Sequence, residues 1–550
     1  MTISKKIIGV YYQINDDFLI KRILEKIEPV DILSSNKLFI FSHIRNRFYM
    51  KLYTILAHAL SKRGYPSCFL FNDRISYHYP FKPQNFIEQI YFFDKISLKS
   101  FEVGTHFPNL IINNTNISNS LIEEKSKTRI INRDQMKKTH YFDWEIDLTN
   151  EITKVKNIDF FPLLRTTLRA VLKRYNIDFK NKNVISKSQE MIRSMDLLLH
   201  YLMLLKKFSK EKNKEIKIIG WEYNYIPNGF FNISCKELIE NRDVEYIDIS
   251  RGYKHYFGGH SRQSYFSAVN LTQSEYRNRN SISKNQVLQI IKNVDKKELV
   301  KPINIVFNKA KKSHQISTEQ KPIIEKCTDF LKDGNNVFVL FSHLFYDNPV
   351  YDCTNAFKDM CDWINYTIKI FDKSKDLLLL KPHPKEIRLD IPEAQPNETL
   401  ESYIKENYST LPSNIILLKP RTFNLYHLFP YITCGLIWKS SASNELTYLG
   451  KTCIISGPSP FKQALDDLHY SQSKHHYESL IKNVKNLKIT DQQKIKIAAY
   501  TYALYTKDVE VKQFCNDKKY NNPYLDQQKI FDYLKNGDSS IDKLVEDMIK

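Results

Sequence analysis

Short apolar runs alternate with amphipathic segments along most of the chain, which is the pattern of an α/β protein. The run KLFIFS at 37–42 predicts a strand, and the segment 46–64 carries apolar residues at helical spacing until Gly64. A second strand is predicted at 65–73. A strand, a helix and a strand in this order predict a βαβ unit with parallel strands.

The same alternation returns further along the first half. The spacing predicts helices at 162–176 and 184–209, both with basic residues at their ends, where the helix dipole favours positive charge. A strand at 215–224, a helix at 229–241 and a strand at 244–250 follow. The first half therefore predicts its own α/β domain.

The second half predicts another series of strands and helices. The expected elements are strand 336–347, helix 355–371, strand 376–381, strand 414–418, helix 422–428, strand 431–438, helix 441–449 and strand 452–456. Two such series predict a GT-B-like α/β fold, in which two Rossmann-like, doubly wound domains face a cleft.

The domain boundaries follow from these patterns. We expect an N-terminal α/β domain over 1–290 with a poorly patterned insertion near 80–160, a C-terminal α/β domain over 291–470, and a helical segment over 471–550. The polar, charged stretch 270–330 is interpreted as the connection between the domains.

Composition narrows the class of protein. A hydrophobic content of 42% excludes a mostly disordered chain. A length of 550 residues is more than a single hydrophobic core accommodates. The 13 glycines form no GxGxxG and no GxxxxGK[ST], which argues against dinucleotide and P-loop chemistry. The eight cysteines form no CxxC pair, and Cys434 and Cys453 lie in apolar runs, as reduced core residues do.

The chain is basic, with 82 Lys and Arg against 61 Asp and Glu and a formal net charge of +21. Because the basic residues are spread along the chain, we expect mostly solvated faces, with attraction to an anionic membrane surface as the next interpretation. No apolar run reaches the length of a membrane span, and the start of the chain does not resemble a signal peptide. These features predict a cytoplasmic protein, with peripheral attachment to the inner face of the cytoplasmic membrane as an extension of that prediction.

The segment LLLLKPHPKE at 377–386 is the first candidate for chemistry. Prolines on both sides of His383 hold the backbone extended at the end of a predicted buried strand. Ligands of open α/β sheets bind beyond the carboxyl ends of the strands. A histidine there can donate to a phosphate or protonate a leaving group, and the alternative is an ordinary turn histidine.

Ser440 and Ser441 form the second candidate, at the start of the predicted helix 441–449. Hydroxyl and backbone N–H groups at a helix start can bind an anion, although an ordinary N-cap explains them equally well in isolation. Glu445 lies one turn later and could accept hydrogen bonds from a ribose.

Further candidates lie at other strand ends. His343 and Asp347 follow the first strand of the second domain, and Glu222 follows the strand that ends at Gly220 in the first domain. Either carboxylate could serve as a base for a sugar hydroxyl. A basic loop that could hold an anionic acceptor contains Arg251, Lys254, His255 and Arg262.

These segments resemble the bacterial capsular polysaccharide biosynthesis family that includes Kdo transferases. KPHPKE is similar to that family's HP motif, and GLIWKSSASNELTYLGKTCIISGPSPF is similar to its serine motif. Both motifs are shared with sialyltransferases that use CMP-sialic acid and, more loosely, with CDP-glycerol transferases. Segments 341–371, 220–238 and 248–262 match more weakly, and the family often has His where this chain has Glu222 and Asn228.

The resemblance implies a GT-B glycosyltransferase with a nucleotide-sugar as substrate and no cofactor. The lack of a DxD-type metal cluster predicts that it needs no metal. It implies transfer of Kdo or a similar sugar from a CMP-activated donor to a glycan or lipid-linked acceptor, alongside capsule assembly proteins and without nucleic acid. Glu222, His383 and Asp347 would be catalytic. The residues expected to bind the donor are Lys381, His383, Lys385, Glu386, Ser440, Ser441 and Glu445.

Two alternatives stay open from the sequence. The same motifs suit a transferase of polyol phosphate that uses CDP-glycerol or CDP-ribitol. The positive charge also suits a non-enzymatic protein that binds an acidic polymer.

Overall fold

The computed structural model describes two large parts of the chain. The described residues are 15–70 without 17, 21, 24–25, 28–29, 31–34 and 43–46; 112–113 and 116–117; and 142–550 without 222–223, 227, 239–243, 252–264, 273–281, 312–315, 348–353, 355, 388–395, 424, 460, 463 and 517–522.

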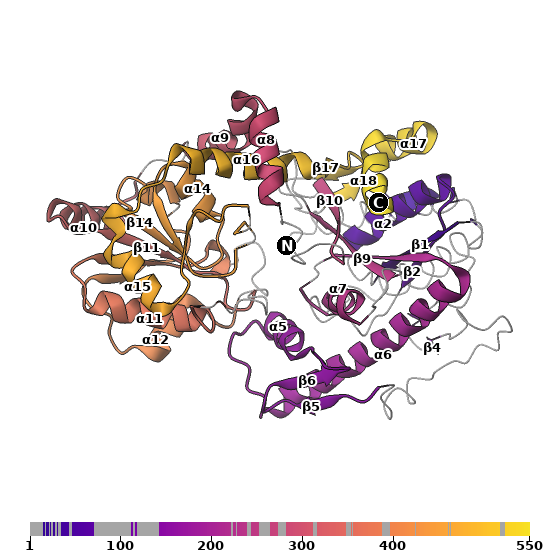
Figure 1. Ribbon diagram of the computed structural model, residues 1–550, viewed down its shortest axis with the longest axis horizontal. Helices are drawn as coiled ribbons and strands as arrows, with labels where there is room; N and C mark the ends of the chain where they lie inside the picture. Colours follow the sequence, from indigo (N-terminus) through magenta and orange to yellow (C-terminus); the bar gives the residue numbers. More distant parts are fainter. Residues whose placement is uncertain are drawn as a thin grey trace, which may run out of the picture.

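The chain builds two six-stranded sheets, and the first of them includes one strand from near the end of the chain (Figure 1). The first has the order β17 (Val509–Glu510), β10 (Tyr265–Asn270), β9 (Val244–Arg251), β8 (Glu215–Gly220), β1 (Lys37–Ser42) and β2 (Ser67–Leu70). The second has the order β13 (Ile415–Leu417), β12 (Leu377–Lys381), β11 (Val337–Phe341), β14 (Cys434–Ile437), β15 (Thr452–Ile455) and β16 (His469–Tyr470). The second sheet is parallel throughout, and the first is parallel from β9 to β2. The prediction of two doubly wound α/β domains is confirmed.

The central strands β11 and β12 of the second sheet are apolar up to Lys381 at the end of β12, because helices cover both faces of the sheet. Every residue of β11 and β12 is buried. One face packs against α11 (Met360–Asp372), α12 (Leu400–Asn407) and α15 (Lys474–Lys482).

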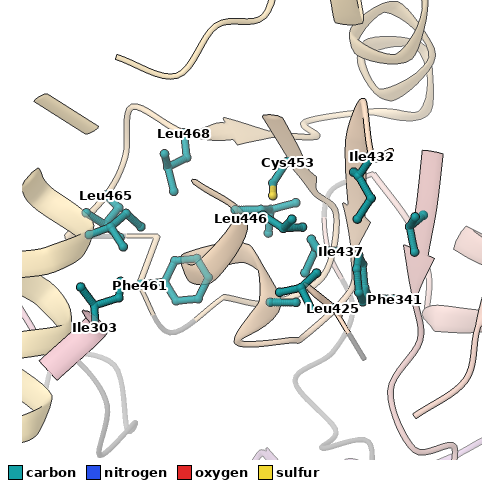
Figure 2. Close-up of a cluster of buried hydrophobic side chains, with 14 of the residues drawn as sticks. Ile303, Phe341, Leu425, Ile432, Ile437, Leu446, Cys453, Phe461, Leu465 and Leu468 are labelled. Atoms are coloured by element: carbon teal, nitrogen blue, oxygen red, sulfur yellow. The ribbon is translucent and has the colours of Figure 1, made fainter. Parts of the chain in front are cut away.

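The other face packs against α14 (Ala442–Tyr448) and α16 (Asp491–Lys507). Figure 2 shows Leu446 of α14 beside Ile437 of β14 and Cys453 of β15. Cys434 and Cys453 are buried free thiols, as the sequence predicts.

The first sheet is also covered on both faces. The long helix α6 (Lys182–Lys212), α5 (Phe161–Leu172) and α7 (Asn228–Glu237) pack on one side. Helix α2 (Arg47–Lys62) and α18 (Ser539–Ile549) pack on the other. Residues 142–160, from the expected insertion, contribute a small antiparallel sheet of β5 (Glu145–Asp147), β6 (Ile152–Val155) and β7 (Ile158–Asp159).

The stretch 270–330 is not only a connection between domains. It contains α8 (Lys284–Asn293), α9 (Lys296–Lys311) and α10 (Lys321–Lys332). Some of their apolar residues, among them Val287 and Leu299, are buried in the core of the second domain, whereas Leu288 and Leu331 are exposed. Each helix therefore buries one narrow stripe and exposes charged residues on the rest of its surface, which explains why the sequence resembles a linker.

The last 80 residues are shared between the domains rather than forming a separate helical segment. Helices α15 and α16 pack on the second domain, and α16 then leads back to the first (Figure 1). There β17 pairs with β10 at the sheet edge, and α17 (Gln527–Asn536) and α18 bury apolar residues against α2. An apolar stripe identifies a helix that needs a partner surface but does not specify which domain provides it.

Direct contacts join the domains at a second place. The segment after α5 inserts Tyr175 into the second domain, where its ring lies 5.8 Å from that of Phe345. The Asn397 backbone N–H donates to the carbonyl oxygen of Lys173 at 2.9 Å. Tyr225 donates from its hydroxyl to Asp347 Oδ1 at 2.6 Å. These contacts bring the first domain against the carboxyl ends of the second sheet.

Among the helices that the structure describes, none has the length and apolar character needed to span a lipid bilayer.

Candidate active site

Three neighbouring strands end together at one edge of the second sheet. Strand β11 lies between β12 and β14, and Phe341 is in register with both Lys381 and Ile437. The residues that follow each strand therefore converge. They are His343 after β11, His383 after β12, and Ser440 after β14.

His383 lies in a turn that its own ring stabilises. Its backbone is extended (φ −66°, ψ 136°), and the short 3₁₀ turn Pro384–Glu386 follows. The Lys385 backbone N–H donates to His383 Nδ1 at 3.1 Å, so the hydrogen of the neutral ring is on Nε2. Burial and the neighbouring His343 lower the pKa of His383 to about 3. The ring therefore presents a neutral N–H donor to a ligand.

The ring of His343 lies beside that of His383. The two ring centroids are 5.7 Å apart, with an interplanar angle of 48°. Its backbone N–H points to the sulfur of Met360 in α11 at 3.4 Å, and its Nδ1 lies 3.3 Å from the Leu344 carbonyl oxygen. Burial lowers the pKa of His343 as well.

Charged groups of both signs surround the two rings. Asp347 raises the pKa of His343 and of His383, whereas Lys385 lowers both and Lys439 lowers that of His343. The positive charges suit an anionic ligand at this edge. Asp347 adds a carboxylate beside the rings and, through Tyr225, a link to the first domain.

The serines occupy the start of α14 in a different way from the prediction. Ser440 Oγ accepts a hydrogen bond from the Ala442 backbone N–H at 3.2 Å, so Ser440 makes the local cap. Ser441 is exposed and makes no side-chain cap. The helix has only seven residues, so its dipole contributes little, and the hydroxyls and backbone N–H groups are the available donors. Binding of a phosphate by Ser440 and Ser441 stays a prediction.

Glu445 is held by a neighbouring helix. Tyr426 in α13 (Leu425–Leu428) donates to Glu445 Oε2 at 2.8 Å, and burial raises the pKa of the carboxyl group. The carboxylate is half-buried, with Oε2 already engaged. A ribose hydroxyl would therefore have to donate to Oε1 of Glu445, and that role stays a prediction.

Lys381, before the His383 turn, and Glu386, at its end, are buried rather than on the surface. They are 8% and 3% exposed, respectively. Glu386 Oε2 accepts from the Leu400 backbone N–H at 3.1 Å, while Oε1 is buried without a hydrogen-bond partner. Burial raises the pKa of Glu386 to about 7 and lowers that of Lys381 to about 8. This arrangement is suited to supporting the turn, while direct donor binding by either side chain stays a prediction; Lys385 is exposed.

Several predicted residues cannot be placed. Glu222, Lys254, His255 and Arg262 lie outside the described residues, and of Arg251 only the backbone is described, paired with Phe266. The base and acceptor roles predicted for them stay predictions.

The structure adds residues that the sequence did not single out. Arg421 has a left-handed backbone (φ 67°) and donates from Nε to the Pro384 carbonyl oxygen at 2.8 Å, which supports the His383 turn. Lys439 and Tyr225 join the site through the fold alone. Arg421 follows a Lys–Pro pair that indicates a turn, but nothing in the sequence connects it to a turn 37 residues earlier.

Among the described residues, no group of three or more His, Cys, Asp or Glu side chains is placed to hold a metal ion. The absence of a metal requirement stays a prediction.

The two doubly wound domains, with polar groups collected at the carboxyl edge of the second sheet, define a GT-B-like class of fold. No protein-family model and no curated protein sequence matches the chain. Among solved structures, it is similar to Thermosulfurimonas dismutans KpsC, a beta Kdo 2,7 transferase, with 12% identity over 60% of this chain and 89% of that chain and a TM-score of 0.28. A structure of apo OtsA matches with 11% identity over 91% of this chain and 99% of that chain and a TM-score of 0.31. Similarity at such low sequence identities and TM-scores does not identify a substrate.

Proposed function

We propose that the protein is a glycosyltransferase that takes a sugar from a nucleotide-activated donor. The observation that carries the proposal is the convergence of His383 and Ser440 on one edge of a buried parallel sheet. The first presents a ring N–H and the second a hydroxyl, and both are donors for phosphate oxygens. The KPHPKE and serine motifs that supply these residues are the ones that resemble the capsular polysaccharide family.

The same geometry suits the chemistry of the leaving group. When the bond between the sugar and the phosphate breaks, negative charge develops on the phosphate oxygen. Neutral donors that are already in place stabilise that charge without reorganising. Lys439 and Lys385 add positive charge at the same edge.

We propose CMP as the nucleotide and Kdo or a similar acidic sugar as the group transferred, because the motif pair is shared with transferases that use CMP-sugars. The acceptor would be a glycan or a lipid-linked glycan of a surface polysaccharide. Such an enzyme would work in the cytoplasm at the inner face of the membrane, near capsule assembly proteins. We propose that it needs no metal and no cofactor.

A nucleotide screen tests the proposal. The melting temperature of the full chain is measured with CMP, UDP, GDP and ADP at equal concentrations. We expect the largest increase with CMP, because a ligand that binds only the folded state stabilises it by mass action. A larger increase with UDP would assign another donor class, and no increase with any nucleotide would argue against a nucleotide site.

Product analysis distinguishes the remaining alternatives. Incubation with CMP-Kdo or with CDP-glycerol, followed by mass spectrometry, should show a glycosidic product from the first and none from the second. A phosphodiester product from CDP-glycerol would identify a polyol-phosphate transferase. Salt-sensitive binding of an acidic polymer without any product would identify a binding protein instead.

A further inference from the structure

The two imidazoles at the sheet edge are held in opposite tautomers. His383 Nδ1 accepts a hydrogen bond from the Lys385 N–H, so its Nε2 carries the hydrogen. His343 Nδ1 faces the carbonyl oxygen of Leu344 at 3.3 Å. Because a carbonyl oxygen only accepts, Nδ1 of His343 carries the hydrogen and its Nε2 has a free lone pair. One ring presents a donor and the other presents a basic acceptor.

The groups around His343 keep it neutral and ready to take a proton. Asp347 on its own loop favours the charged ring, whereas Lys439 after β14 and Lys385 in the turn after β12 disfavour it. Met360, which contacts it from α11, is uncharged. Burial shifts the balance toward neutral imidazole, the form that a general base needs at physiological pH.

The two tautomers select different partners. A phosphate oxygen accepts from the Nε2–H of His383, but it repels the lone pair on Nε2 of His343. The partner of His343 must carry its own hydrogen, and in a sugar transfer that group is a hydroxyl. Both rings are half-buried and so partly open to a ligand, at the edge where Tyr225 of the first domain reaches Asp347.

We propose that His343 is the catalytic base of the transfer and takes the proton of the acceptor hydroxyl through Nε2. This inference rests on the proposed function. In the step, the acceptor oxygen forms a bond to the anomeric carbon and its proton moves to His343. The bond between the anomeric carbon and the phosphate oxygen breaks, and its electron pair stays on the phosphate, which accepts from His383. The imidazolium then loses its proton to water.

Asp347 takes a supporting role in this scheme. Its Oδ1 accepts from the Tyr225 hydroxyl at 2.6 Å, so this oxygen is already engaged by the first domain. A carboxylate beside His343 also stabilises the imidazolium that forms during the reaction. Asp347 is therefore a positioning residue rather than the base.

The test compares His343→Gln with the matched control His475→Gln, an exposed histidine on α15. Glutamine keeps a hydrogen-bond acceptor but cannot take a proton. We expect His343→Gln to lower the rate of transfer from CMP-Kdo about 100-fold to 10,000-fold while the Kd for CMP changes less than threefold. The wild-type rate should fall when acid protonates His343, at a pH below the ordinary pKa of histidine because burial lowers the pKa of His343, and the variant should lack that fall.

A second measurement does not depend on activity. Nitrogen NMR of the wild-type protein, with signals assigned from the two variants His343→Gln and His383→Gln, should show the hydrogen on Nδ1 of His343 and on Nε2 of His383. The same tautomer at both rings would overturn the proposal. A loss of CMP affinity in His343→Gln as large as that in His383→Gln would also overturn it, by making His343 a phosphate ligand. Failure of CMP to bind the wild type would instead contradict the proposed function.

Discussion

At the scale of single residues, His383 combines a local structural role with an open functional group. Its Nδ1 is occupied by the turn, and its Nε2–H is left for a ligand. The sequence predicts the position of this residue, because the prolines around it and the apolar run before it are local signals. Which ring nitrogen faces the ligand depends on the Lys385 backbone and required the structure.

We predict that His383→Ala lowers the transfer rate at least 100-fold and weakens CMP binding, because a preorganised donor to the leaving phosphate is lost. The melting temperature should stay close to that of the wild type, since the ring is half-buried and its one hydrogen bond is local. Calorimetry with CMP and a thermal melt check both statements, with His475→Ala as the control. Full activity in His383→Ala would show that His383 is not part of the active site.

The buried carboxyl group of Glu386 predicts a pH dependence of stability. Its pKa is raised to about 7 in the folded protein, above the ordinary value of about 4.3 in the unfolded chain. The folded state therefore binds more protons between these two values, and stability contributed by this group is lost as the pH rises through that window. The slope is at most about 1.4 kcal/mol per pH unit.

Urea unfolding of the wild type and Glu386→Gln at several pH values measures this effect. We expect the wild type to lose stability relative to Glu386→Gln as the pH rises from about 4.5 to 7. Glu406→Gln, an exposed position on α12, should follow the wild type at every pH. A constant difference between wild type and Glu386→Gln would show that Glu386 ionises normally.

At the scale of elements, most strands and helices follow from local pattern. The strand predicted at 376–381 is β12 at Leu377–Lys381, and the helix predicted at 441–449 is α14 at Ala442–Tyr448. Strand β10 was not predicted, since its place is decided by antiparallel pairing with β9. Pairing between strands is a property of the sheet and has no local signature.

One contact between elements fixes the position of the segment 438–441, called here the serine loop, which follows β14 and contains Ser440 and Ser441. A Cβ added to Gly457, just after β15, would lie 2.0 Å from the carbonyl oxygen of Trp438. Trp438 directly precedes Lys439 and Ser440, and its backbone cannot move without displacing them. The approach of two backbones here requires glycine, although the sequence did not single out Gly457.

We therefore predict that Gly457→Ala destabilises the protein by about 1–3 kcal/mol and also weakens CMP binding at least tenfold. Gly334→Ala is the matched control, because Gly334 has a left-handed backbone (φ 77°) remote from the site and an open space around it. It should destabilise by about 1–2 kcal/mol without changing CMP affinity. Equal CMP affinity in both variants would argue that the serine loop does not bind the nucleotide.

At the scale of the whole molecule, the domains are joined by the returning C-terminal segment and by direct contacts, among them those of Tyr175 with Phe345 and of Tyr225 with Asp347. The nucleotide candidates all lie in the second domain, whereas Tyr225 lies in the first. If the proposed function holds, transfer requires the approach of the domains, whereas nucleotide binding requires the second domain alone.

Tyr225→Phe removes one hydroxyl and tests whether transfer depends on the contact between the domains while nucleotide binding does not. We predict a transfer rate about tenfold lower, which corresponds to about 1.4 kcal/mol, because the hydrogen bond to a charged carboxylate is lost. The Kd for CMP should stay within twofold of the wild-type value. Small-angle scattering should show a larger radius of gyration in Tyr225→Phe than in Tyr502→Phe, a control on α16. Unchanged rate and radius would show that this contact does not hold the domains together.

The amino-acid sequence by itself determined the two α/β halves, the buried strands of the second sheet and the positions of His383 and Ser440, because apolar runs, prolines and turn residues act over a few neighbours. Only the tertiary structure decided the strand order that brings His343 beside His383, the support of their turn by Arg421, and the return of the last helices to the first domain. These features depend on which surfaces bury one another. That choice is made between segments far apart in the chain, where local pattern carries no information.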